Sequence, residues 1–169
     1  MGVRRGLAVP ALRLKADRLL LRLPVVGRLL RETLAAQLTR TLGTLLQNGM
    51  PLVPALGIAE QALGNLAAAA AVNAASVAAK GGRGLARPLA DAGVFPARTI
   101  HLLQLGEEAA QLAVMSLKAA ELHDEQARLI VQRIVALLVP IITIAMGLAV
   151  AGIVGALLTA MLSLNDLAA

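Results

Sequence analysis

Acidic and imidazole side chains that can do chemistry gather between positions 121 and 125. Four residues carry them: Glu121, His123, Asp124 and Glu125. Side chains of this kind bind metal ions. Consecutive residues on a helix point in different directions, however, so His123, Asp124 and Glu125 do not easily converge on one ion. We therefore expect a solvated helix face and no metal site. His101 has no carboxylate or cysteine beside it in sequence, and we expect it to be half-buried or at an interface.

Two further carboxylates stand in residues 106–108 (GEE). We expect Gly106 to stop one helix, so that Glu107 and Glu108 lie at the N-terminus of the next and interact favourably with its dipole. The alternative interpretation is that Glu107 meets a basic residue of a partner or a hard cation such as calcium.

Catalytic motifs are missing from this sequence. It has no cysteine, and its three serines lie inside predicted helices or in a long apolar stretch. The glycine-rich residues 81–84 (GGRG) follow an alanine-rich segment and lack the Lys-Ser/Thr ending of a phosphate-binding loop. No acid pair stands in a recognisable catalytic frame. We expect a protein that is not an enzyme and that carries no cofactor.

The composition predicts an all-α fold. Hydrophobic residues make up 58% of the chain, yet there is one Phe and no Trp or Tyr. The core must therefore consist of Leu, Ala and Val, and the prevalence of Leu and Ala favours helices over strands. Apolar spacing and Gly, Pro and Asn punctuation predict helices at 29–47, 51–63, 66–80, 84–92 and 96–105, with a last one from about 109. We expect a compact bundle of about six short helices followed by one C-terminal transmembrane helix.

Residues 134–165 contain no Lys, Arg, Asp, Glu or His. About 20 apolar residues already cross the hydrocarbon core of a bilayer, so this stretch predicts a membrane-spanning helix. Arg128 and Arg133 precede it and only Asp166 follows, which predicts a cytoplasmic body and a C-terminus on the far side of the membrane. The expected organisation is a basic juxtamembrane segment (1–24), a cytoplasmic helical domain (25–133), the transmembrane helix (134–165) and a short non-cytoplasmic tail (166–169).

The beginning of the chain is strongly basic. Between Arg4 and Arg31 lie eight basic residues against Asp17 alone, interleaved with leucines. Such a segment can lie on an anionic lipid surface, where each Lys or Arg contributes about 1 kcal/mol. Nucleic-acid binding is the other interpretation of this charge. We favour lipid, because the chain offers no aromatic stacking platform and no recognisable DNA-binding motif.

Several residues have turn or packing roles in this reading. Asn48, Gly49 and Pro51 predict a helix-to-helix turn, because Gly accepts the left-handed conformation and Pro begins the next helix. Phe95 and Pro96 predict another turn whose ring fills the core, with a docking site as the alternative. Within the apolar stretch, four-residue spacing of small side chains predicts a surface for contact with other membrane helices: Gly147, Ala151 and Gly155.

The order of these features resembles the type II secretion system F-domain family, the inner-membrane platform proteins of type II secretion and type IV pilus machines. The resemblance rests on residues 23–27 (LPVVG), 41–52 (TLGTLLQNGMPL), 94–96 (VFP) and 106–108 (GEE), followed by an apolar helix that carries Pro140. Family members usually have two such domains, so this chain resembles the second one with the final membrane helix. It is then either a fragment or one half of a split protein.

The resemblance implies a platform subunit that couples a cytoplasmic assembly ATPase to the assembly of pilin or pseudopilin, alongside other inner-membrane subunits and further copies of itself. On this basis we expect Arg98, Glu107 and Glu108 to dock a partner. Two positions depart from the family pattern: Ala110 stands where a glycine is common, and Val139 where a glutamate precedes the membrane proline. The alternative function is a membrane-tethered adaptor whose basic arm binds anionic lipid or a regulatory partner.

Overall fold

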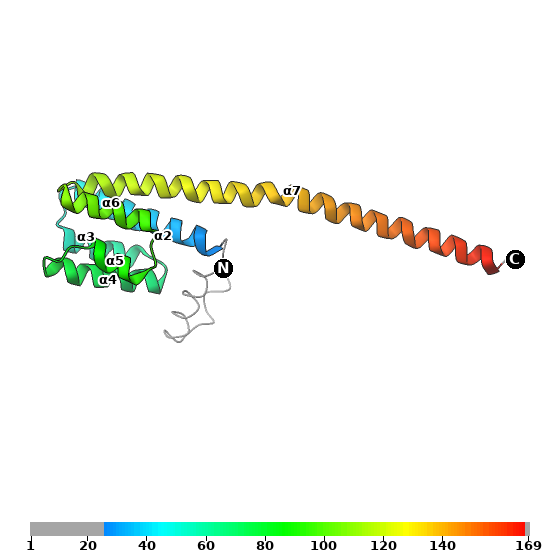
Figure 1. The fold of residues 1–169 in the computed structure, drawn as a ribbon, viewed down its shortest axis with the longest axis horizontal. Helices are drawn as coiled ribbons and strands as arrows, with labels where there is room; N and C mark the ends of the chain where they lie inside the picture. Colours follow the sequence, from blue (N-terminus) through cyan, green and yellow to red (C-terminus); the bar gives the residue numbers. More distant parts are fainter. Residues whose placement is uncertain (1–25, 168–169) are drawn as a thin grey trace. The chain divides into compact units, whose positions relative to one another are not determined.

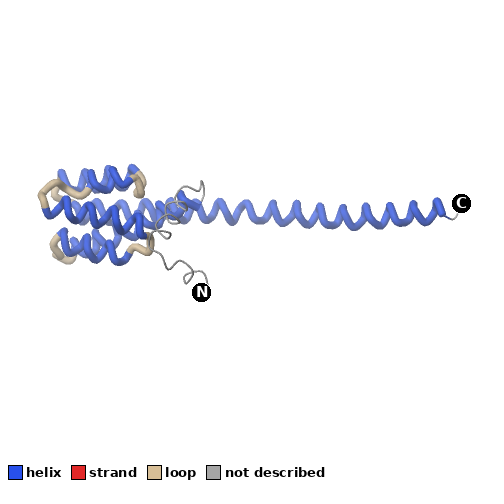
Figure 2. Tube along the Cα trace, turned by 90° about the horizontal axis from the view of Figure 1, so that it is seen from below, coloured by secondary structure: helices blue, strands red, loops and turns tan. Residues whose placement is uncertain are grey.

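The computed structural model describes residues 26–167, which form six helices and no strand (Figures 1 and 2). The helices are α2 (Val26–Gln47), α3 (Leu52–Ala62), α4 (Leu66–Lys80), α5 (Ala86–Ala92), α6 (Ala97–Glu108) and α7 (Leu112–Leu167). The expected all-α fold with one long apolar helix at its end is confirmed. The basic segment 1–24 predicted to lie on lipid falls outside the described residues, as do the last two residues of the tail.

The chain divides into two compact units, and the boundary in the sequence lies between Arg128 and Leu129. The described part of the first unit contains α2 to α6 and the first turns of α7. The second unit is the remainder of α7. We refer to the described part of the first, residues 26–128, as the helical unit. The domain boundaries expected from the sequence stay a prediction.

Leucines and alanines build the interior of the helical unit. The largest fully buried apolar side chains come from five helices and one loop: Leu38, Leu42, Leu56, Val72, Leu85, Leu89 and Leu103. Phe95 is also buried and belongs to the same core. Gly43 of α2 marks a close approach to α7, because a Cβ there would lie 2.8 Å from Leu117 Cγ and 2.9 Å from the Leu117 nitrogen. Small side chains thus let these helices pack tightly.

The turn after α2 has the geometry of a Schellman motif. Gly49 has φ +82°, its N–H donates to the Leu46 carbonyl, and the Met50 N–H donates to the Leu45 carbonyl, both at 3.0 Å. Pro51 then takes the N-cap position of α3. The structure therefore places residues 48–51 in a turn that satisfies the last carbonyls of α2.

The end of α6 differs from the sequence prediction. The helix does not stop at Gly106 but continues to Glu108, and α7 begins at Leu112. Ala110 takes the left-handed position of a second Schellman motif, with φ +53°, and the Gln111 N–H donates to the Gly106 carbonyl at 2.9 Å. The glycine turn was predicted four residues too early, because an alanine occupies the position that backbone geometry would assign to glycine.

Gly106 has a packing role inside α6. A Cβ on it would lie 3.0 Å from both Leu112 Cα and Met115 Cβ of α7. The residue is buried, and it lets the end of α6 approach the first turn of α7. The sequence prediction of a turn at Gly106 is therefore wrong, although the residue does require a small side chain.

The second unit is helical throughout its described residues, and its large apolar side chains from Val131 to Leu157 are exposed. An 18-residue window of this helix reaches a mean hydropathy of 2.7 with no part buried, and by length and composition the helix can cross a membrane. Pro140 lies inside it without ending it. Nearby, the Thr143 hydroxyl donates to the Val139 carbonyl at 3.0 Å, so this polar side chain is satisfied within its own helix.

Candidate functional site

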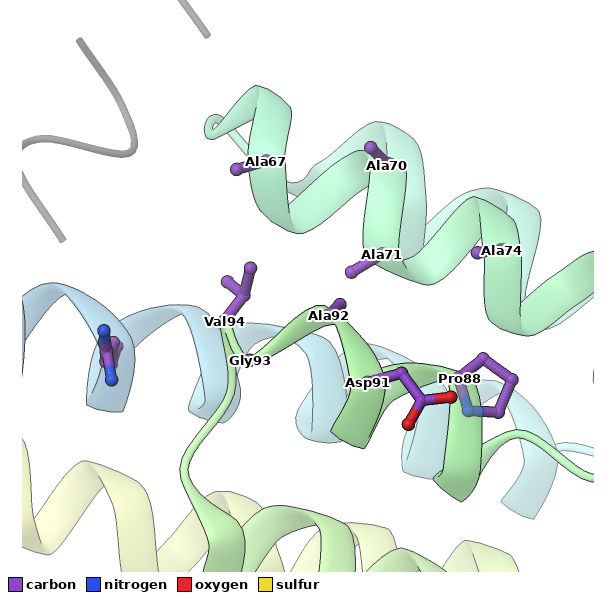
Figure 3. Close-up of a pocket in the computed structure, with 10 residues that line it drawn as sticks. Ala67, Ala70, Ala71, Ala74, Pro88, Asp91, Ala92, Gly93 and Val94 are labelled. Carbon is purple, nitrogen blue, oxygen red and sulfur yellow. The ribbon is translucent and has the colours of Figure 1, made fainter. Parts of the chain in front are cut away.

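A groove runs along α4 of the helical unit, and we call it the alanine groove (Figure 3). It consists of two adjoining cavities of about 760 Å³ and 530 Å³, which share Ala74, Pro88 and Asp91 in their lining. One face of α4 forms its floor, with alanines at three- and four-residue spacing: Ala67, Ala70, Ala71, Ala74 and Ala78. In Figure 3 this floor faces Val94, Asp91 and Pro88.

Arginines stand at the two ends of the alanine groove. Arg31 of α2 lines the cavity that contains Ala67, whereas Arg83 and Arg87 line the one that contains Ala78. The Nε atom of Arg31 is buried and has no hydrogen-bond partner. Within residues 26–167, none of these arginines forms an ion pair. The groove therefore presents an apolar floor between cationic ends.

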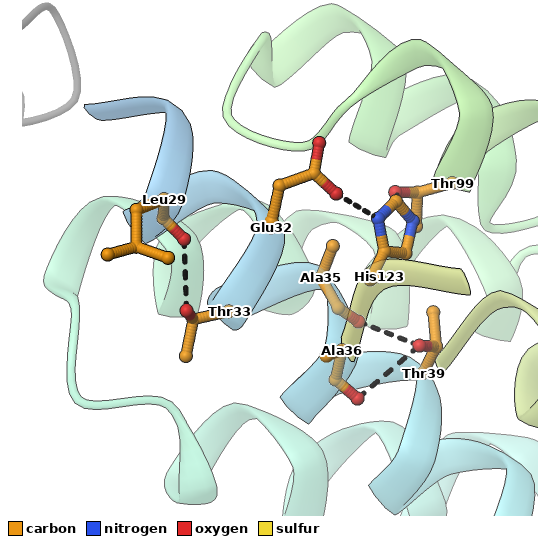
Figure 4. A network of polar contacts seen from close by, with 8 residues as sticks. All are labelled: Leu29, Glu32, Thr33, Ala35, Ala36, Thr39, Thr99 and His123. Carbon is orange, nitrogen blue, oxygen red and sulfur yellow. Dashed lines mark hydrogen bonds and ion pairs between the residues drawn. The ribbon is translucent and has the colours of Figure 1, made fainter. Parts of the chain in front are cut away.

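A buried polar network joins three helices of the helical unit (Figure 4). His123 of α7 is fully buried, its Nδ1 lies 2.5 Å from Glu32 Oε2 of α2, and its Nε2 lies 2.8 Å from Thr99 Oγ1 of α6. A proton on Nδ1 serves the carboxylate, and Nε2 can then accept the hydroxyl proton of Thr99. All three side chains gain partners, so the network fixes how the three helices pack.

The order carboxylate, imidazole, hydroxyl is also that of a hydrolase triad. Thr99 and His123 are both fully shielded from solvent, however, and Glu32 is 7% exposed. A substrate cannot reach the Thr99 hydroxyl unless the helices separate. In this conformation the network serves packing and has no access for catalysis.

The prediction of a solvated face at residues 121–125 is wrong for His123. That side chain turns into the core, while Asp124 beside it forms an ion pair with Arg40 on the surface. Glu121 and Glu125 are exposed. His101, expected to be half-buried or at an interface, is exposed and lines a small cavity near Phe95.

Glu107 binds backbone atoms of its own chain. Its Oε1 accepts the Leu85 N–H at 2.5 Å and its Oε2 accepts the Ala86 N–H at 3.2 Å. These amides stand at the N-terminus of α5, where a helix has unsatisfied donors. The predicted helix-dipole interaction at the start of α7 is wrong, because Glu107 and Glu108 lie at the C-terminal end of α6. The carboxylate of Glu107 instead serves the N-terminus of α5, 21 residues earlier.

The other predicted docking and packing residues lie on the surface. Arg98 is exposed in the first turn of α6, and Glu108 is exposed in the last turn, where it accepts a hydrogen bond from Gln104 at 2.9 Å. Arg98 and Glu107 therefore do not form one site. Along the apolar part of α7, Gly147, Ala151 and Gly155 are all exposed. The roles predicted for these residues in partner contact remain predictions.

Sequence reasoning missed the buried network, although the helical pattern carried a signal for it. Glu32 shares a helix face with buried Ala35 and Thr39. His123 likewise follows Ser116, Ala119 and Ala120 on one face, and all of these are buried. A lone ionisable residue among small side chains at helical spacing indicates a buried group that needs a partner from another helix. The identity of that partner depends on packing and was not readable from spacing.

Comparison with known proteins bears on the whole chain. The family model described as type II secretion system (T2SS), protein F, matches residues 38–160. A type II secretion system protein F of Xanthomonas campestris is 42% identical over 134 residues, which are 79% of this chain and 33% of that protein. Its counterpart in Pseudomonas aeruginosa is 35% identical over 167 residues, 99% of this chain and 41% of that protein.

A protein of a different machine is similar as well. The type IV pilus assembly protein PilC of Myxococcus xanthus is 30% identical over 145 residues, 86% of this chain and 34% of that protein. This chain thus spans between 33% and 41% of the length of these three relatives.

Proposed function

The chain belongs to the type II secretion system protein F family, and on this premise we propose that it is a non-enzymatic platform subunit of a bacterial inner membrane. The family resemblance found in the sequence is confirmed. The observation that carries the proposal is that the matched residues join a packed helical unit to a helix with exposed large apolar side chains. A scaffold needs both parts, one for partners and one for the bilayer.

The proposed topology follows from charge. Arg128 and Arg133 stand just before the apolar part of α7. The positive-inside bias then puts the helical unit in the cytoplasm and the C-terminus in the periplasm. The polar surface of the helical unit suits an aqueous compartment, whereas the exposed leucines, isoleucines and valines of α7 suit lipid.

The proposed partners follow from the family resemblance and from the surfaces available. The platform would couple an assembly ATPase in the cytoplasm to pilin or pseudopilin subunits rising from the membrane. Arg98 and Glu108 are exposed and free to meet a partner of opposite charge, whereas Glu107 is occupied at the start of α5. Gly147, Ala151 and Gly155 would let other membrane helices, including those of further copies, approach closely.

The proposed role is tested with a chimera. In Pseudomonas aeruginosa, the matching segment of the resident protein F is exchanged for this chain, and secretion by the type II system is measured. We expect secretion to be retained at a substantial fraction of the wild-type level. A chimera that is inserted in the inner membrane at normal abundance yet secretes nothing would refute the proposed role. The matched control is the same chimera with Leu148→Arg and Ile144→Arg, which we expect to lose insertion and secretion together.

The docking residues are tested in the same strain. A photo-crosslinking amino acid replaces Arg98 or Glu108, and the adducts are identified by mass spectrometry. We expect adducts with cytoplasmic components of the machine. The control position is Gln47, which is exposed at the C-terminal end of α2. Adducts at Gln47 should be different or absent. Identical adducts at all three positions would show random collision and not docking.

A further inference from the structure

We propose that the alanine groove binds an amphipathic helix of a partner protein, and that this helix carries carboxylates at both ends of the face that enters the groove. The inference goes beyond the proposed function, because it names the face of the helical unit that receives a partner and the chemistry of that partner. It is argued from the shape of the groove, from its charges and from one buried atom without a partner.

The shape of the floor fits a helix. From Ala67 to Ala78 the floor alanines follow a single face of α4, a length of about 16 Å or three helical turns. Alanine methyl groups are small and leave room for larger apolar side chains of an incoming element. A helix that inserts its apolar face into such a groove contributes side chains at three- and four-residue spacing, which matches the spacing of the floor. The cavity volumes show that no residue of the chain's described part fills this space.

The charges select the partner. Three arginines line the groove, Arg31 at one end and Arg83 with Arg87 at the other, against the single carboxylate of Asp91 between them. None of them is neutralised by an ion pair within the described residues. A guanidinium binds a carboxylate through two parallel hydrogen bonds, so an acidic side chain about three turns from another would meet both ends.

Arg31 supplies the independent observation. Its Nε is buried and makes no hydrogen bond, and the neighbouring carboxylate of Glu32 directs its Oε2 to His123. Buried donors are nearly always paired, so this atom marks a place where an acceptor is to be expected. Arg31 as a whole is only partly buried, so its side chain can turn to meet an acceptor that the partner helix brings.

The arrangement also argues against an extended polyanion as the occupant. Asp91 would lie in the middle of such a chain and repel it, and the floor offers methyl groups where a phosphate backbone needs donors. A helix with an apolar stripe would contact the alanine floor, and acidic residues at the ends of this stripe would pair with the arginines at the ends of the groove.

The proposal is tested with two synthetic helical peptides of about four turns. Both carry leucines at three- and four-residue spacing; one has glutamates at each end of this stripe, and the other has lysines in the same places. The full chain is placed in nanodiscs of zwitterionic lipid, and binding of the labelled peptides is followed by fluorescence anisotropy. We expect the glutamate peptide to bind and the lysine peptide to bind at least tenfold more weakly.

Four variants locate the binding. Arg83→Glu together with Arg87→Glu should weaken the glutamate peptide at least tenfold and strengthen the lysine peptide. Ala74→Phe should fill the groove and abolish binding of both. The controls are Lys118→Glu, a single charge reversal outside the groove, and Val77→Phe, an enlargement to the same final side chain on the exposed side of α4; each should change affinity less than twofold.

Circular dichroism spectra verify that each variant keeps its helix content. The proposal is overturned if the glutamate peptide does not bind, if both peptides bind equally, or if Ala74→Phe binds like the wild type. Equal losses in Ala74→Phe and Val77→Phe would also overturn it, because they would place the contact elsewhere on α4.

Discussion

The helical unit and the apolar part of α7 use the same apolar residue types in opposite ways, buried in the first and exposed in the second. In the helical unit leucines and alanines are buried, and the buried side chains of Glu32, Thr99 and His123 are paired with one another. In the second unit leucines, isoleucines and valines are exposed. Val77 of α4 and Leu148 of α7 are 57% and 69% exposed, yet one is an isolated apolar residue on a polar surface and the other belongs to a continuous apolar surface.

This difference shows that overall composition specifies one region, whereas residues at individual positions specify the other. The apolar part of α7 depends on composition, because lipid requires only that charged groups be absent and that backbone groups be satisfied within the helix. The helical unit depends on individual positions, because its helices meet at specific small residues and polar pairs. Substitutions should therefore act in different ways in the two regions.

The largest expected effect comes from charging the apolar surface of α7. Each arginine at the centre of a spanning helix costs about 3 kcal/mol of insertion free energy, so Ile144→Arg with Leu148→Arg should cost about 6 kcal/mol. We expect the double variant to be released from membranes by alkaline carbonate, which the wild type resists. Val77→Arg, equally exposed in the helical unit, should remain in the membrane fraction. If the double variant stayed carbonate-resistant, the contrast between the regions would be lost.

The next effect distinguishes a buried link from an exposed one between the same two helices. His123→Leu leaves the Glu32 carboxylate buried without its partner and should lower the free energy of unfolding of the helical unit by about 3 kcal/mol. Arg40→Met removes the exposed ion pair with Asp124 and should cost about 0.5 kcal/mol or less. Thermal unfolding of the chain in detergent, followed by circular dichroism, measures both.

A double variant sharpens this prediction. Adding Glu32→Leu to His123→Leu removes the stranded carboxylate, so part of the lost stability should return. If the double variant is less stable than the sum of the two single losses predicts, the two residues do not act as a buried pair.

The smallest expected effect concerns two turns with the same geometry. Gly49 and Ala110 both have positive φ at the end of a helix. Ala110→Gly should raise the free energy of unfolding by about 1 kcal/mol, and Gly49→Ala should lower it by a similar amount, because only glycine adopts this conformation without strain. A Cβ at Gly49 meets no atom within 4 Å, so the loss would come from the backbone alone.

Gly57 provides the control for this pair. It lies inside α3, where an added Cβ also meets nothing within 4 Å. Gly57→Ala should therefore stabilise the helix by about 1 kcal/mol. Thermal unfolding of all three variants under one condition gives the comparison, and equal signs for Gly49→Ala and Gly57→Ala would contradict the interpretation of the turn.

Sequence reasoning succeeded where a local pattern determines the structure. The helix at Leu66–Lys80 was predicted with its observed bounds, because Asn65 caps its start and glycines follow its end. The apolar stretch of α7 is equally local, since its composition alone identifies it. At Ala110 the same reasoning failed, because the left-handed position of the turn is occupied by alanine, a residue type that does not indicate a turn in sequence.

The contacts of the candidate site were beyond such reasoning. Glu107 meets Leu85 and Ala86, and His123 meets Glu32, 91 residues away in sequence. Pairs of this kind depend on how helices cross, which periodicity does not specify. Sequence analysis predicted α4 as a helix, but its alanine spacing did not indicate the alanine groove that the structure shows along it.

The contacts of Glu107 and His123 join residues far apart in sequence, so they limit when the helical unit can finish folding during synthesis at the ribosome. Helix α5 has only 7 residues, too few to form a stable helix alone. The amide of Ala86 at its start has no carboxylate partner until Glu107, 21 residues later in the chain, has been synthesised. The imidazole that joins α2 to α6 emerges later still, just ahead of the apolar stretch. The helical unit therefore reaches its final packing only when the apolar part of α7 is about to leave the exit tunnel, so that folding and the emergence of this apolar surface fall within the same interval of translation.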